Sequence, residues 1–321
     1  MPKLVDLLAK GLSHGKFWTD AWSLVSGCTP VSLGCKNCWL ASWSRRFEDG
    51  LVNDQGQFNG TVRMNVDRLN KPLRSKKPRV YAIWSDLFHA AVPGHFLDGA
   101  FAVMAMSPHH HFVIVTKRPE LAAAYLSDVR RQELADRSAH YRRDRSPRII
   151  TSGVWPLPNV TILGTVEDQT MAEIRVPHLL RIAKEGWRVG ILAEPLLGPI
   201  DLAGAGAIWS DMNSNIVDNR AFRGGLSWVL AGGESGPRAR VAKTAWFRQL
   251  RDQSFAARIP FLLKSLGEWV DSRDIHLEPF GPVPEGPVCK VGEDIYQRVG
   301  KKFSGRAIDG MEWSEVPDVG E

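Results

Sequence analysis

The stretch VTILGTVEDQ, residues 160–169, joins a β-branched and aliphatic run to a polar cluster. Continuous apolarity without alternation is typical of a parallel strand that is buried on both faces. Five other runs show the same pattern and are bounded by polar or turn residues. The six predicted strands are 79–84, 111–116, 160–166, 188–193, 227–231 and 260–264.

The segments between these runs are long enough for crossover helices. We predict helices over 94–106, 120–133, 171–185 and 244–257, and a further strand, first in order, over 21–26. Strands that alternate with helices form βαβ units and a parallel sheet. The predicted fold class is therefore α/β, a partial or near-complete parallel β/α barrel with an irregular C-terminal extension.

The same pattern predicts the domain organisation. We expect one barrel domain over residues 1–270, with a cysteine-bearing loop at 27–39. Residues 130–159 are rich in arginine and 204–223 in asparagine and glycine, and both are predicted to be insertions. The stretch 271–321, rich in glycine and proline, is predicted to pack on the barrel as an extension.

The composition fits a globular protein, with 44% hydrophobic and 24% charged residues in 321. A formal net charge of +6 favours an anionic partner such as a nucleic acid or nucleotide. The apolar stretches are much shorter than the roughly 20 residues of a membrane helix, and the N-terminus lacks a signal peptide's apolar core. We therefore expect a cytoplasmic protein with no membrane partner.

Three of the four cysteines lie within eleven positions, which favours ligation or redox chemistry over disulfides. They are Cys28, Cys35 and Cys38. Thiolates suit iron–sulfur clusters or zinc. Zinc needs a fourth ligand, for which His14 and His89 are candidates, whereas a four-iron cluster held by three cysteines keeps one iron open. Cys289 is distant in sequence and is predicted to be inert.

Polar residues follow each predicted strand. In a parallel barrel the carboxyl ends of all strands lie on one rim, where active sites are built. We call these polar residues the rim residues. They are Ser85–Asp86, Lys117–Arg118, Glu167–Gln169, Glu194–Pro195, Gly232–Gly236 and Lys264–Ser265.

Three adjacent histidines, His109, His110 and His111, precede a rim residue by one strand length. Successive side chains on a strand point in alternating directions, so the three cannot all reach one metal ion. We predict a solvated loop for that triplet.

Seven ordered blocks resemble the phage-derived three-cysteine-motif proteins, a family of phages and prophages that looks like divergent radical S-adenosylmethionine (SAM) enzymes. The resemblance covers most of the chain. The blocks are GCTPVSLGCKNCW (27–39), IWSDLFHAAVP (83–93), FVIVTKRPE (112–120), LPNVTILGTVEDQ (157–169), AEPLLGPIDL (193–202), WVLAGGESGPRAR (228–240) and IPFLLKSLGEW (259–269).

This resemblance implies a radical-SAM-like barrel in which the three cysteines hold a four-iron, four-sulfur (4Fe-4S) cluster that binds SAM. Radical SAM enzymes typically space these cysteines as C-x3-C-x2-C, whereas the first gap here is six residues. The expected function leans towards an enzyme acting on a nucleic acid or nucleotide. An electron donor would then be required, and a protein encoded nearby is a candidate partner.

Given a cluster that binds SAM, the residue types indicate roles for the rim residues. Asp86, Glu194 and Lys264 are the candidate catalytic residues, the two carboxylates as proton carriers or hydrogen-bond acceptors. Lys117 and Arg118 are candidates for binding an anionic substrate. The candidate cofactor-binding residues are Gly232, Gly233, Glu234, Glu167 and Asp168.

Two other functional classes fit the same residues. In the first, zinc stabilises a non-enzymatic module that binds nucleic acid or a protein partner. In the second, a cluster-free β/α barrel acts as a lyase or hydrolase through Asp86, Glu194 and Lys264, with unligated cysteines.

Overall fold

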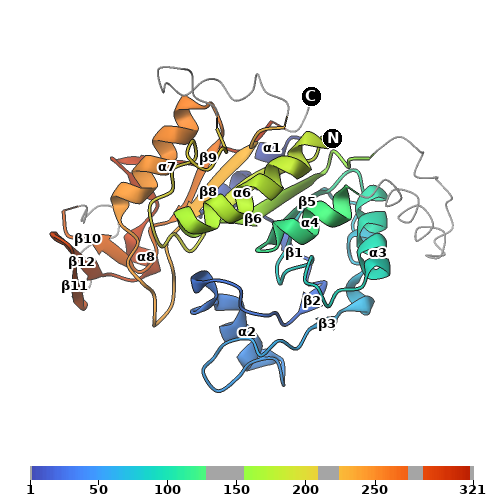
Figure 1. Ribbon diagram of the computed structural model, residues 1–321, viewed down its shortest axis with the longest axis horizontal. Helices are drawn as coiled ribbons and strands as arrows, with labels where there is room; N and C mark the ends of the chain where they lie inside the picture. The colour runs from blue at the N-terminus through green and yellow to red at the C-terminus, as the bar shows by residue number, and fades with distance from the viewer. Residues whose placement is uncertain (1, 128–154, 209–223, 274–284, 319–321) are drawn as a thin grey trace.

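A computed structural model describes residues 2–127, 155–208, 224–273 and 285–318 (Figure 1). Its centre is a seven-stranded sheet in the order β1-β4-β5-β6-β7-β8-β9, in which every neighbouring pair is parallel. Since β1 and β9 are the two edges, the sheet is a partial barrel, and the predicted fold class is confirmed. The strands are β1 (Asp20–Ala21), β4 (Val80–Ile83), β5 (His111–Thr116), β6 (Val160–Thr165), β7 (Arg188–Ala193), β8 (Trp228–Gly232) and β9 (Phe261–Ser265).

All six main strands therefore form where the apolar runs predicted them. The prediction of one further strand over 21–26 was wrong in part: β1 ends at Ala21, and β2 (Val25–Ser26) leaves the sheet to pair antiparallel with β3 (Arg63–Met64). This departure carries the chain away from the sheet just before Cys28.

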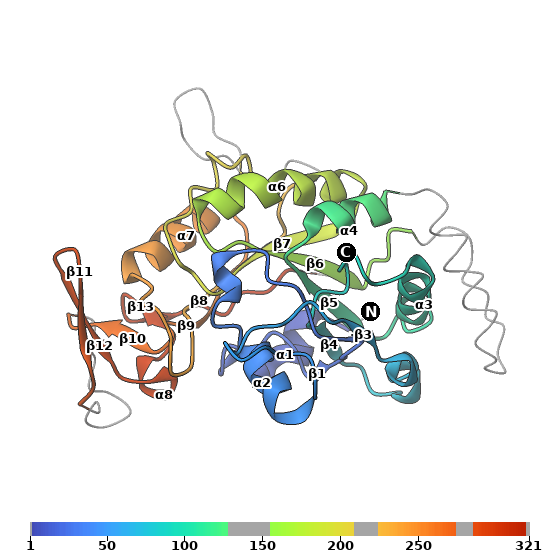
Figure 2. The same ribbon diagram turned by 60° about the horizontal axis from the view of Figure 1, so that its bottom comes forward.

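Four helices cover the convex face of the sheet and follow the predicted crossovers (Figure 2). Their apolar side chains and alternate strand residues such as Tyr81, Ile114 and Ile191 form the larger core. The predicted insertions lie mostly outside the described residues. The helices are α3 (Gly94–Ala105), α4 (Pro119–Leu126), α6 (Gln169–Lys184) and α7 (Thr244–Ala256).

The N-terminal helix α1 (Leu4–Leu12) fills the concave face, a role that the sequence did not suggest. Leu4, Leu8 and Leu12 lie one helical turn apart and are buried against strand residues such as Val113 and Trp228. Successive strand side chains point to opposite faces of the sheet. The concave-facing residues at the carboxyl ends of the strands therefore lie beyond helix α1 and are not covered by it. They form the floor of the rim pocket described below.

The cysteine-bearing loop, residues 27–39, continues into helix α2 (Trp39–Phe47). A short turn, η1 (Leu33–Cys35), lies within the loop. After β3 the chain forms two further turns, η2 (Val66–Arg68) and η3 (Pro72–Arg74), before it enters the sheet at β4. Figure 1 shows α2, β2 and β3 together below the sheet, on the side away from α6 and α7.

The C-terminal extension covers the β9 edge of the sheet. Leu263 N–H donates to the carbonyl of Trp313 at 3.1 Å, and Arg306 binds the carbonyls of Leu263 and Trp313. The extension was expected to be irregular and includes several short elements. These are β10 (Trp269–Asp271), β11 (Val288–Val291), β12 (Asp294–Arg298), α8 (Lys301–Ser304), β13 (Ala307–Ile308) and β14 (Met311–Glu312).

The prediction of a solvated histidine triplet was wrong. His110 and His111 are buried, and they bind the carbonyl oxygens of Pro72 and Pro2 at 3.1 and 3.0 Å. The imidazoles thus satisfy buried carbonyl groups between elements. Within the described residues, no helix is both long and apolar enough to cross a membrane.

Candidate functional site

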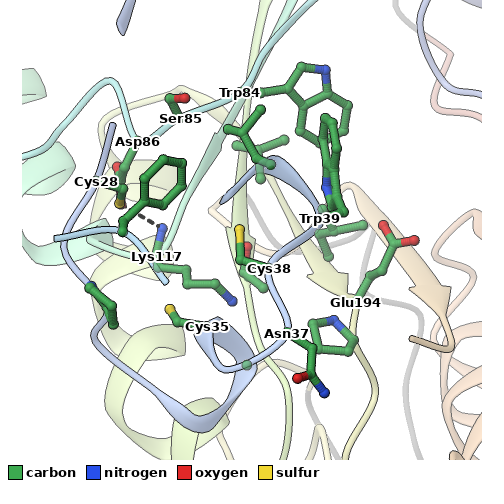
Figure 3. Close-up of a pocket in the computed structure, with 18 of the residues that line it drawn as sticks. Cys28, Cys35, Asn37, Cys38, Trp39, Trp84, Ser85, Asp86, Lys117 and Glu194 are labelled. Carbon is green, nitrogen blue, oxygen red and sulfur yellow. Dashed lines mark hydrogen bonds between the residues drawn. The ribbon is translucent and has the colours of Figure 1, made fainter. Parts of the chain in front are cut away.

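A pocket opens at the carboxyl ends of the strands, between the sheet and the cysteine loop, and we call it the rim pocket (Figure 3). All three clustered cysteines line it, as do Lys117 and Glu194 from the strand ends. Figure 3 shows the thiols of Cys35 and Cys38 on either side of the Lys117 ammonium group. The structure thus brings together residues that are separated by more than 150 positions in the sequence.

Two glycines allow the cysteine loop to approach its surroundings closely. Gly27 has a φ of +84°, and a Cβ there would lie 2.0 Å from the carbonyl oxygen of Thr61. A Cβ on Gly34 would lie 2.3 Å from Oε1 of Glu167. Only glycine fits at these two positions without movement of a neighbour.

Hydrogen bonds reach two of the thiols. Arg118 Nη1 donates to Cys28 Sγ at 3.6 Å, and the N–H of Val31 donates to Cys35 Sγ at 3.5 Å. Burial raises the pKa of both Cys28 and Cys38. These two thiols therefore stay protonated at neutral pH unless a metal displaces the proton, as happens on ligation.

Asp86 holds Arg118 beneath the loop. The two form a buried ion pair at 2.7 Å, and Asp86 also accepts hydrogen bonds from Thr116 Oγ1 and the N–H of Lys117. Arg118 Nη2 then donates to the carbonyl of Thr29 at 2.9 Å. Asp86 lines the pocket, but these bonds occupy both of its oxygens and favour a positioning role over proton transfer.

Glu167 is fully buried beneath the cysteine loop. It forms ion pairs with Lys117 and with Arg175, the latter at 2.6 Å, and it accepts a hydrogen bond from Ser32 Oγ at 2.6 Å. Burial alone would raise the pKa of Glu167, but the two cations outweigh burial and lower it. Glu167 is therefore an ionised anchor for the loop.

Glu234 anchors the other side of the loop. Its carboxylate accepts hydrogen bonds from Asn37 Nδ2 at 3.0 Å and from Arg240, which also donates to the carbonyl of Leu33 at 3.1 Å. Burial opposes ionisation here too, but the bonds from Arg240 and Asn37 lower the pKa of Glu234. Three strand ends, after β5, β6 and β8, thus hold the same loop.

Glu194 is the acidic group of the pocket wall. Lys264 Nζ donates to its Oε2 and lies within 5.8 Å of the ring centres of Phe17, Trp18 and Trp84. Burial lowers the pKa of this lysine. Lys264 does not line the pocket but fixes the position of Glu194, which does.

The remaining predicted residues divide between the pocket and its supports. Gly233 lines the pocket, and a Cβ there would meet the carbonyl of Leu266 at 2.0 Å. Gly232 ends strand β8 below it. Asp168 instead caps helix α6 by accepting a hydrogen bond from the N–H of Met171 at 2.9 Å. Arg118 is buried under the loop and is not on the pocket surface.

Two aromatic residues of the site were not predicted from the sequence. Trp39 and Trp84 line the pocket and pack edge to face with ring centres 5.6 Å apart. Ser85, which was predicted at the rim, also lines the pocket and has a φ of 54°, which is uncommon outside glycine and often marks functional sites. Polar residues at strand ends can be identified from the sequence, but a contact between residues distant in the sequence, such as Trp39 with Trp84, cannot.

The donor geometry bears on the choice of metal. No group of three or more His, Cys, Asp and Glu side chains in the described part of the chain is close enough to hold one ion. His89 uses one ring nitrogen with Thr29 Oγ1 at 2.9 Å and the other with the N–H of Ala91 at 3.0 Å. Both ring nitrogens of His89, a candidate fourth ligand for zinc, are therefore already hydrogen-bonded.

Fold and site together define a partial β/α barrel with a three-cysteine pocket at its rim. Residues 14–317 match the family described as protein of unknown function (DUF5131), and the chain belongs to that family. A search of curated proteins found no match. Among solved structures, a point mutant of spore photoproduct lyase is similar over 87% of this chain and 68% of its own, with 13% identity and a TM-score of 0.38.

Proposed function

We propose that this protein is an iron–sulfur enzyme of the radical SAM type. The observation that carries the proposal is the convergence of Cys28, Cys35 and Cys38 on one pocket at the carboxyl ends of parallel strands. Such ends are where barrel enzymes build their active sites. The fourth cysteine, Cys289, lies in β11 of the extension and does not line the pocket.

The residues present fit a 4Fe-4S cluster. The three cysteines would hold it, and three protein ligands leave one iron for an exchangeable ligand. Hydrogen bonds to Cys28 and Cys35 are of the kind that tune a cluster's potential. When bound, the cluster supplies reductive cleavage of the SAM sulfonium, the chemistry by which radical SAM enzymes abstract hydrogen.

The chain's own residues provide binding and orientation. Glu194 offers a carboxylate to a cationic group, since Lys264 occupies Oε2 and, among the described residues, no hydrogen bond reaches Oε1. The ammonium group of Lys117, which is paired with Glu167, favours the charged form of Cys38. Trp39, Trp84 and Phe58 supply apolar walls that exclude water.

The rim anchors keep the loop in place. Arg118, Glu167 and Glu234 each join a strand end to the loop backbone or to a polar side chain of the loop. Positioning of this kind matters because small displacements of reactive groups lower rates strongly. We infer that these three residues support the site, and that Glu234 is the one of them that also lines the pocket.

The test is anaerobic incubation of the reduced, cluster-loaded protein with SAM, followed by mass spectrometry for 5′-deoxyadenosine. Wild-type protein and a Cys289→Ala variant should both form it, while Cys38→Ala should not. A loaded wild-type protein that leaves SAM intact under reduction would refute the proposal.

A further inference from the structure

The outer surface beside the rim pocket carries an aromatic row. Trp39, Trp43 and Phe47 are spaced four residues apart on α2, so they share one face of the helix. They are 52%, 42% and 67% exposed, and the rings of Trp43 and Phe47 are 5.1 Å apart. Trp39 also lines the pocket, so the row connects the pocket to the outer surface.

Two cationic side chains, Arg45 and Arg46, lie on the same helix as this row, and further cations follow along the chain. Residues 36–79 contain ten Lys and Arg against four Asp and Glu, so this stretch alone accounts for the formal net charge of +6. The exposed cations form what we call the basic strip. It consists of Arg45, Arg46, Arg63, Arg68, Lys71, Arg74, Lys76 and Lys77.

The strip is continuous with the helix that bears the aromatic row. Figures 1 and 2 show β3 beside α2, on the opposite side of the sheet from α6 and α7. Arg63 Nη2 would lie 3.2 Å from a Cβ on Gly50, three residues beyond the end of α2. Further along, Arg68, Lys71 and Arg74 line a second cavity, together with Asp67.

Two guanidinium groups converge beside Gly56, on the side of α2 away from the row. A Cβ on Gly56 would lie 3.2 Å from Arg238 Nη2 and 3.7 Å from Arg45 Nη1. Neither arginine has a carboxylate partner among the residues that the structure describes. Paired cations without counter-charges favour an anionic oxygen such as a phosphate.

From these observations we propose that α2 and the basic strip bind single-stranded nucleic acid, with bases stacked on the aromatic row and phosphates on the strip. Non-specific single-strand binding combines these two features. A protein partner is a weaker fit for the strip as a whole, because it contains eight cations and charged residues are depleted from the core of protein interfaces. This inference rests on the proposed function, because it names single-stranded nucleic acid as the substrate class that is presented to the rim pocket.

The test is fluorescence anisotropy with a labelled single-stranded oligonucleotide of about 16 nucleotides. Trp43→Ala and Phe47→Ala should each weaken binding about tenfold. Arg45→Ala with Arg46→Ala should weaken it and lower the salt slope by about two. Phe255→Ala and Arg181→Ala, exposed residues on α7 and α6, are matched controls that should bind like the wild type.

Equal losses in the control variants, or tighter binding of duplex or of an acidic peptide than of the single strand, would overturn the inference. Anisotropy is measured without SAM or reductant, and iron content is determined separately. Wild-type protein that contains iron but does not bind the oligonucleotide would therefore refute this inference alone. Binding without iron would support it while refuting the proposed function.

Discussion

Glu167 accepts a hydrogen bond from Ser32 Oγ at 2.6 Å across 135 residues of sequence. This contact joins the end of β6 to the cysteine loop three residues before Cys35. The Arg118 contact with Thr29 and the Glu234 contact with Asn37 are equivalent links from β5 and β8. The sheet thus fixes a loop that has little regular structure of its own.

Replacing Glu167 should be costly. Glu167→Gln keeps the size of the side chain but leaves the buried guanidinium of Arg175 without its carboxylate. Breaking a buried pair in this way costs about 3 kcal/mol in the free energy of unfolding. Urea denaturation measures the loss. Glu173→Gln, an exposed change on helix α6, should cost less than about 0.5 kcal/mol, and an equal cost for the two variants would contradict the anchoring role.

Gly34→Ala should separate loop geometry from overall folding. Its methyl group would collide with Glu167, which two ion pairs hold in place. We expect a near-native circular dichroism spectrum with iron content after reconstitution reduced severalfold. Ser32→Ala removes only the hydroxyl group and should reduce iron less. Full iron loading in Gly34→Ala would show that the close approach is dispensable.

The lowered pKa of Lys264 should change how the free energy of unfolding depends on pH. Because burial lowers its pKa, the unfolded state binds more protons between the folded-state pKa and that of an ordinary lysine. The wild type should therefore gain stability relative to Lys264→Met as the pH rises between the two pKa values, the upper of which is about 10. Denaturation midpoints of the two proteins across this range measure the difference. A constant difference would mean that the pKa of Lys264 is not lowered.

Much of the fold could be predicted from sequence because buried parallel strands read as continuous apolar runs. His111–Thr116 and Arg188–Ala193 begin and end where the runs predicted. The strand expected over 21–26 failed because its second half pairs with Arg63–Met64, a partner that periodicity does not indicate. Likewise, nothing in the spacing of Leu4, Leu8 and Leu12 says which face of the sheet they fill.

The place of the candidate site in the fold could be predicted from the sequence, but the roles of its individual residues could not. Several of the polar residues predicted at strand ends and the three clustered cysteines line one pocket. Individual roles depended on pairings over long sequence distances, such as Glu234 with Asn37. Asp168 illustrates the limit, because a residue after a strand is also the residue that caps the next helix.

The most direct test of the central claim is metal analysis of anaerobically purified protein with EPR of the reduced form, with and without SAM. If the three cysteines hold a 4Fe-4S cluster, we expect about four irons per chain and an EPR spectrum that SAM perturbs. We also expect the same iron content in Cys289→Ala and a large loss in Cys35→Ala. Colourless protein that resists reconstitution, or one zinc per chain, would contradict the claim.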